Sequence, residues 1–297
     1  HLLHDLERGG PLALAPLDGP ILLLSEESAG HWVRRRDELN IGSGVHLLTS
    51  PFRGRPSPDE WVGLVDTIAE MVQGEPGYRL VIIDTLSALW PVQEENSAGE
   101  VLGALLPLRA LADAGAAVLL THHPRKSGGE EGRAARGSSA LVGFPDILIE
   151  LQRLTPDDAA DNRRVLYGLG RFDEVPSEQV IELTDGQGYR VIGNKAQATE
   201  DDRIAELERI MFDAGLEGIT ADDALTAWPT QPRPSKRALQ TDLNRGTDRG
   251  RWFRVGTGRK GDPFRYSGCR DSIPASPLAK VRETKSGPQQ GTLAEVN

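Results

Sequence analysis

The chain has 297 residues, of which 38% are hydrophobic and 26% are charged, and its formal net charge at pH 7 is -10. No apolar run approaches the ~20 residues that a membrane-spanning helix needs, and the single cysteine, Cys269, excludes an internal disulfide and a cysteine-based metal site. We therefore expect a cytoplasmic protein without a membrane partner, long enough for one full α/β core and a smaller module.

The first predicted element is the end of a helix. Residues 1–8 carry apolar side chains at helical spacing, and the pair Gly9-Gly10 that follows is a stop signal. The chain begins with His1 rather than Met and has no polar or basic leader. We therefore expect no signal or transit peptide and regard the chain as a fragment.

From residue 20 onward, short apolar runs alternate with longer amphipathic stretches, a pattern typical of α/β folds. Four near-continuous apolar runs predict strands buried on both faces of a parallel sheet: 21–24, 45–48, 80–83 and 117–120. The clearest helices between them are predicted over 59–73 and 97–114. Later segments alternate and predict strands that close the sheet in antiparallel fashion: 147–151, 164–169, 179–183 and 189–192.

The C-terminal third predicts a second module. A short polar linker, 194–201, precedes three predicted helices and a strand pair, at 202–214, 220–228, 235–244 and around 258–261. Three small helices and a hairpin favour a winged helix over 202–267, whereas 268–297 has little to bury and predicts a disordered tail. Residues 233–265 hold ten Lys/Arg against three Asp, a net charge of +7, so any nucleic-acid contact should be local.

Asp84 and Thr85 follow an apolar strand directly, at the carboxyl end where open α/β sheets bind ligands. This pattern is typical of a Walker B element. The acid of that element contacts, usually through water, the Mg²⁺ that bridges a nucleotide's phosphates. Taken alone, the motif is also explained by an Asp that forms a turn. The neighbouring strand ends favour the site.

Two acids, Glu26 and Glu27, end the strand over 21–24, where a carboxylate can orient and deprotonate the water that attacks the γ-phosphate. The simpler alternative is that they cap the next helix. Thr121, His122 and His123 end another strand and are candidates to sense the γ-phosphate. The two histidines lack a third or fourth ligand at a suitable spacing, which argues against a metal site.

Two basic segments predict nucleic-acid contacts. The Gly-rich run over 124–140 predicts a cationic loop facing single-stranded DNA backbone, with a solvated surface loop as the alternative. The helix beginning at Ser235 and the wing after it predict DNA contacts, unless the module packs on the core or on another protein. The candidate contact residues are Lys126, Arg133, Arg136, Ser138, Lys236, Arg237, Arg259 and Lys260.

The order and spacing of several motifs resemble the RepA-type plasmid and phage ATPases, hexameric replicative helicases and AAA-family ATPases of the RecA/DnaB superfamily. The motifs are Leu24-Ser25-Glu26-Glu27, Ile83-Asp84-Thr85-Leu86, Glu94-Glu95-Asn96, Thr121-His122-His123 and Arg136-Gly137-Ser138-Ser139-Ala140-Leu141. The resemblance covers residues 1–193. It implies a RecA-like P-loop NTPase core, with a mostly parallel sheet and helices on both faces, that uses ATP and Mg²⁺.

The resemblance also implies roles for single residues. Glu27 matches the catalytic carboxylate, with Glu26 as the alternative, and Asp84 matches the acid associated with Mg²⁺ and lies next to Thr85 at the nucleotide. His122 or His123 matches the γ-phosphate sensor. Arg171, after the late strand over 164–169, resembles the arginine that reaches the neighbouring subunit's γ-phosphate in such rings, although an ordinary surface salt bridge would explain it as well.

One departure from the family limits what this chain does. The motif Gly-x-x-x-x-Gly-Lys-Ser/Thr occurs nowhere in the 297 residues, and in RepA-like chains it directly precedes the helix that we expect at residues 1–8. We therefore expect the chain to bind ATP poorly and its intact parent to be an ATP-dependent DNA helicase of phage or plasmid replication. The alternatives are an ATP-dependent loader that does not unwind DNA, and a nucleotide-independent DNA-binding regulator with a decayed core.

Overall fold

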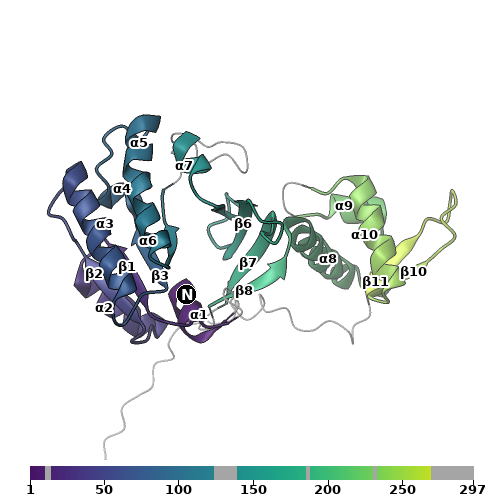
Figure 1. Cartoon of the computed structure of the whole chain (residues 1–297). Coiled ribbons are helices and arrows are strands. Elements are labelled where there is room, and N and C mark those ends of the chain that lie inside the picture. The colour runs from purple at the N-terminus through teal and green to yellow at the C-terminus, as the bar shows by residue number, and fades with distance from the viewer. Residues whose placement is uncertain (11–14, 124–138, 185–187, 230–232, 269–297) are drawn as a thin grey trace, which may run out of the picture. The chain divides into compact units, whose positions relative to one another are not determined.

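The computed structural model describes residues 1–10, 15–123, 139–184, 188–229 and 233–268 (Figure 1). The chain divides into two compact units, His1–Lys195 and Ala196–Asn297, which are treated separately below as unit 1 and unit 2. The expected tail over 268–297 lies, apart from Gly268, outside the described residues. Within the described ranges, every helix is too short or too polar to cross a bilayer.

A four-stranded parallel sheet forms the centre of unit 1 and has the order β2-β1-β3-β4. Its strands are β1 (Ile21–Ser25), β2 (Val45–Thr49), β3 (Leu80–Asp84) and β4 (Ala117–Leu120). These are the four predicted apolar runs, and β1 is buried along its whole length. Near-continuous apolar strands are stable when both faces of the sheet are covered, and the predicted parallel sheet is confirmed.

Helices cover both faces of this sheet, as the α/β prediction requires (Figure 1). Leu22 and Leu24 of β1 point to one face, which is covered by α3 (Pro58–Gln73), α4 (Leu86–Leu89), α5 (Ala98–Leu105) and α6 (Arg109–Asp113). The alternate residues Ile21 and Leu23 point to the other face, which is covered by α1 (Leu2–Arg8) and α2 (Ala29–Leu39).

The helix predicted over 97–114 is broken in the structure. It consists of α5, a short 3₁₀ turn η1 (Leu106–Leu108) and α6. Pro107 lies in that turn, because proline has no N–H to donate and its ring clashes with the carbonyl four residues earlier. The buried Trp61 of α3 donates its indole N–H to the Ala104 carbonyl at 2.8 Å and fixes α5 against α3.

The late strands of unit 1 are antiparallel, as predicted, but they do not close the parallel sheet. β5 (Ile147–Arg153), β6 (Arg163–Gly170), β7 (Glu178–Thr184) and β8 (Gly188–Gly193) form a second sheet in chain order, preceded by α7 (Ser139–Gly143). Exposure alternates along β5, so only one of its faces is covered. Strands with that pattern are typical of antiparallel sheets joined by short turns, and they pair with each other here.

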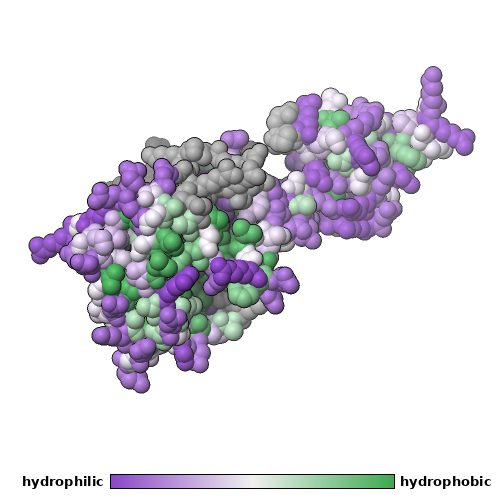
Figure 2. All heavy atoms as spheres, turned by 45° about the horizontal axis from the view of Figure 1, so that its top comes forward, coloured by the Kyte–Doolittle hydropathy of each residue, from purple (hydrophilic) through white to green (hydrophobic). Residues whose placement is uncertain are grey.

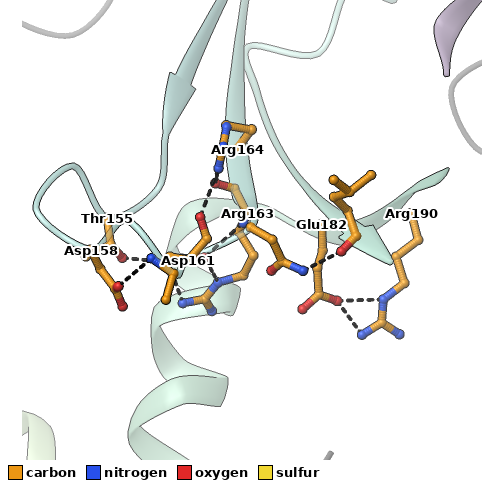
Figure 3. A network of polar contacts seen from close by, with 10 residues as sticks. Thr155, Asp158, Asp161, Arg163, Arg164, Glu182 and Arg190 are labelled. Carbon is orange, nitrogen blue, oxygen red and sulfur yellow. Dashed lines mark hydrogen bonds and ion pairs between the residues drawn. The ribbon is translucent and has the colours of Figure 1, made fainter. Parts of the chain in front are cut away.

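A polar network closes the β5–β6 turn (Figure 3). Asp161 accepts hydrogen bonds from the Arg163 backbone and guanidinium and from the Thr155 hydroxyl, at 2.8–3.0 Å. Burial by itself raises the pKa of Asp161, but these hydrogen bonds outweigh it and hold the pKa below its ordinary value of 3.8. The ionised carboxylate therefore stabilises this end of the sheet.

In its described residues, unit 2 consists of three α-helices, one 3₁₀ turn and a small antiparallel sheet in the order β10-β11-β9. In chain order it has α8 (Lys195–Ala214), η2 (Gly215–Glu217), β9 (Ile219–Thr220), α9 (Ala221–Thr226), α10 (Lys236–Asp248), β10 (Trp252–Val255) and β11 (Arg265–Gly268). α8 begins at Lys195 rather than at Asp202, so the segment predicted as a linker is helical. Its alanines favour helix strongly enough to extend the element through polar residues.

The core of unit 2 is built around Trp252, Tyr266 and Trp228, each 5% exposed or less. Gly246 of α10 faces the Trp252 ring so closely that a Cβ there would overlap it. Hydrophilic side chains cover most of the visible surface of this unit (Figure 2).

Candidate functional site

The candidate site lies at the carboxyl ends of three neighbouring parallel strands (Figure 1). Ser25, the last residue of β1, is in register with Asp84, the last residue of β3, and Ile83 is in register with Leu120 of β4. Glu26, Asp84 and Thr121 therefore leave the sheet at the same edge. Open α/β sheets bind ligands at this edge.

Two short hydrogen bonds join these strand ends. The Thr85 backbone N–H donates to Glu26 Oε2 at 2.6 Å, and the Thr121 hydroxyl donates to Asp84 Oδ1 at 2.6 Å. The Leu86 N–H also donates to the Thr121 carbonyl, at 2.9 Å. Glu26 is thus brought beside the Asp84-Thr85 pair, although the two segments are almost sixty residues apart in sequence.

Glu27 contacts residues of α2. Its carboxylate pairs with the Arg35 guanidinium, with Nη1–Oε2 and Nη2–Oε1 distances of 2.6 and 3.0 Å, and the His31 ring lies 3.9 Å away. The Arg35 guanidinium also lies over the Trp32 ring, 5.0 Å from its centroid. Glu27 is therefore paired with α2 rather than with the ends of β3 and β4.

His122 follows β4 and is surrounded by residues of the segment after α4. Its Nε2 lies 3.6 Å from Glu95 Oε1, and its ring meets the Trp90 ring edge-on at a centroid distance of 5.8 Å. Its Nδ1 lies 2.8 Å from the His123 carbonyl, while His123 itself is exposed. The structure therefore places His122 at the correct edge, with its ring directed to Trp90 and Glu95.

Arg171 follows β6 in the antiparallel sheet and pairs with Asp146. Its Nη1 lies 3.1 Å from Asp146 Oδ1, and both side chains are about two-thirds exposed, at 65% and 67%. An exposed ion pair contributes at most about 1 kcal/mol, so this guanidinium exchanges partners readily. Its predicted action on a neighbouring subunit stays a prediction.

The predicted DNA contacts divide into two groups. Lys126, Arg133, Arg136 and Ser138 lie outside the described residues. In unit 2, Lys236 pairs with Asp222 at 2.5 Å, with both side chains exposed. Arg237, Arg259 and Lys260 are exposed and make no ion pair with any residue that the structure describes.

The oxygen ligands at the site fit Mg²⁺, which prefers one or two carboxylates together with waters and substrate phosphates. Asp84 provides such a carboxylate at the strand end, and Thr121 orients it. Among the described residues, no group of three or more His, Cys, Asp or Glu side chains is arranged to hold a metal ion. Asp84 is therefore suited to a metal that arrives with a nucleotide.

Two residues of the site region were not among the predicted site residues: Arg35 and Glu95. Arg35 lies eight positions after its partner Glu27, a spacing that carries no signal because a turn separates them. Thr121 and Glu95 stand inside motifs that the sequence singles out, but their partners, Asp84 and His122, become visible only in the folded chain.

Comparison with known proteins agrees with this geometry. Residues 1–129 match a family described as an AAA domain. No curated protein matches the chain. The matched region contains the parallel sheet and its site, and it supports an AAA/RecA-like domain of the P-loop NTPase type with a nucleotide-binding, ATPase-type function.

Proposed function

We propose that this chain is the core and C-terminal module of an ATP-dependent DNA helicase that acts as a ring on single-stranded DNA during phage or plasmid replication. The observation that carries the proposal is the hydrogen bond from the Thr85 backbone to Glu26, which sets an exposed carboxylate beside Asp84. The AAA-domain match supports nucleotide use, and the parallel sheet supports a RecA-like core.

Glu26 is the better candidate for the catalytic base. Its side chain is exposed at the edge and accepts, among the described residues, the Thr85 backbone N–H, whereas Glu27 pairs with Arg35. A general base must lie within hydrogen-bond reach of the attacking water, and Glu26 lies beside Asp84 at the strand ends. Asp84 would hold a Mg²⁺ ion through water, and that ion would supply positive charge to the nucleotide's phosphates.

Two further parts of the chain complete the proposal. Arg171 would reach the neighbouring subunit's γ-phosphate, since its exposed pair with Asp146 is easily exchanged. Unit 2 would act as a winged helix that binds DNA through α10 and the β10–β11 hairpin, with Arg237, Arg259 and Lys260 contacting phosphates. Lys236 stays in this set, because its pair with Asp222 is exposed and weak.

ATP turnover by the protein tests the proposal. Glu26→Gln should keep nucleotide binding and lose turnover by about 10²–10⁴-fold, the usual contribution of a general base, whereas Glu27→Gln should keep most activity. If Glu27→Gln alone abolishes turnover, Glu27 is the base and the geometric assignment fails. No turnover in the unaltered protein would favour the nucleotide-independent regulator, and turnover without strand displacement would favour the loader.

A further inference from the structure

The segment between β2 and α3 presents two arginines, Arg53 and Arg55, at the same edge of the sheet as Glu26. β2 ends at Thr49, which is in register with Ser25, so residues 50–57 begin beside the candidate site. Both arginines are exposed. Neither makes an ion pair with any residue in the described ranges.

Anchors on both sides hold the tip of this segment. Phe52 packs against the core cluster under α3 and α5, and Pro56 is buried. Ser57 then caps α3 in a reciprocal capping box. Between the anchors, only Arg53, Gly54 and Arg55 reach solvent. Because its ends are fixed, the tip loses little backbone freedom when it binds a ligand.

A shortage of carboxylates does not explain why the two arginines are unpaired. Residues 1–195 contain 29 Asp/Glu against 18 Lys/Arg, and three arginines of α2 each pair with a carboxylate. Backbone hydrogen bonds from Glu94 and Gln93 lower the pKa of Glu100, and the charge of Arg55 acts in the same direction, so an acid lies nearby. Arg53 and Arg55 lie on an anchored loop and make no ion pair with the described residues, so their guanidinium groups are available to bind an external anion.

We propose that Arg53 and Arg55 form a phosphate-binding site for the backbone of single-stranded nucleic acid. Guanidinium groups bind phosphate oxygens in bidentate fashion, and two of them on one loop span adjacent positions of an anionic ligand. This inference rests on the proposed function, since it assigns a second nucleic-acid contact to the same core.

The same loop is tied to the candidate base. The Ser50 N–H donates to the Ser25 carbonyl at 2.7 Å, and the Ser50 hydroxyl donates to the Glu26 carbonyl at 3.2 Å. A nucleic acid bound at Arg53 and Arg55 is therefore connected to the backbone of Glu26 through the hydrogen bonds of Ser50. This link offers a direct route by which nucleic acid would change the rate of hydrolysis.

The test measures binding of a labelled oligothymidylate of about 20 nucleotides, long enough to exceed one site, to the 297-residue chain in a salt titration without ATP. Arg53→Gln/Arg55→Gln should weaken binding and reduce the salt slope by ~0.7 per lost contact, about 1.4 for the pair. The matched control, Arg34→Gln/Arg36→Gln, removes the same charge from guanidiniums already paired with Glu38 and Asp37. It should leave the slope unchanged, and any contacts made by unit 2 cancel in this comparison.

Equal slopes for the two variants, with circular dichroism confirming that both are folded, would overturn the proposal. Competition by ATP or inorganic phosphate distinguishes the source of the phosphate. If ATP displaces the oligonucleotide and the Arg53/Arg55 variant loses ATP binding, the site serves a nucleotide and the nucleic-acid assignment is wrong. Because these measurements need no hydrolysis, a failure of the proposed ATPase function would leave their outcome standing.

Discussion

Replacing Arg203 by alanine should destabilise unit 2 strongly. Asp242 of α10 is 2% exposed, and Arg203 of α8 is its partner, with an Nε–Oδ2 distance of 2.6 Å. Removing one partner of a buried pair leaves a charge without compensation and costs about 3–5 kcal/mol. Arg203 is 26% exposed, so water screens part of the loss and we expect the lower end, ~3 kcal/mol. For a unit of this size that corresponds to a fall in Tm of about 12–24 °C.

Arg209→Ala on the same helix is the matched control. Arg209 is about half exposed and pairs with Glu206 and Asp213, and such surface pairs contribute about 0–1 kcal/mol. Tryptophan fluorescence in a thermal or urea titration reports the loss, since Trp228 and Trp252 lie in the core of unit 2. A Tm for Arg203→Ala no lower than that for Arg209→Ala would refute the reasoning.

Three further outcomes follow from single contacts. Gly246→Ala should destabilise unit 2 by about 1–3 kcal/mol in urea titrations, because the added methyl overlaps the Trp252 ring. Glu7→Gln should lower the Tm of unit 1, since the carboxylate accepts two backbone N–H groups at 2.6 and 2.7 Å and charged hydrogen bonds contribute about 1.5–3 kcal/mol. Against the effect of burial, hydrogen bonds lower the pKa of Asp161 in the folded state, so its ionised carboxylate stabilises the fold above pH 3.8. This part of the unfolding free energy is lost as the pH falls through the folded-state pKa. An Asp161→Asn variant should not show that loss when stability is measured in an acid titration.

The parallel sheet was predictable from sequence because its strands are buried on both faces and are therefore apolar throughout. The second sheet was predicted as strands but not as a separate sheet. Which strands pair depends on contacts between residues far apart in the chain. The alternating pattern of β5 indicates only that one of its faces is covered, and it does not indicate the strand with which β5 pairs. The break in the helix over 97–114 was readable from Pro107, whose ring forbids a regular helix there.

At the site, the sequence located the strand ends, and the family resemblance gave Glu27 as the catalytic carboxylate with Glu26 as the alternative. Neighbouring residues at a strand end point in different directions, and the apolar run before them fixes neither direction. The two acids differ in partners that the pattern does not reveal: the Thr85 amide donates to Glu26, and the Arg35 guanidinium pairs with Glu27. A motif alone therefore does not distinguish two neighbouring acids, because their roles depend on the partners that each side chain contacts.

The ten Lys/Arg of residues 233–265 overstate the number of cations that are available to contact DNA. Of these ten cations, several are already matched by acids of unit 2, including Arg245 and Arg249 on Glu200 and Arg251 on Glu208. If all ten contacted phosphate, the salt dependence of binding to duplex DNA would have a slope near ~9, whereas the three predicted contact residues that make no ion pair among the described residues, Arg237, Arg259 and Lys260, give ~2.7. A measured slope close to the smaller value would mean that the acids of α8 hold one side of the module away from DNA and leave α10 and the hairpin to face it.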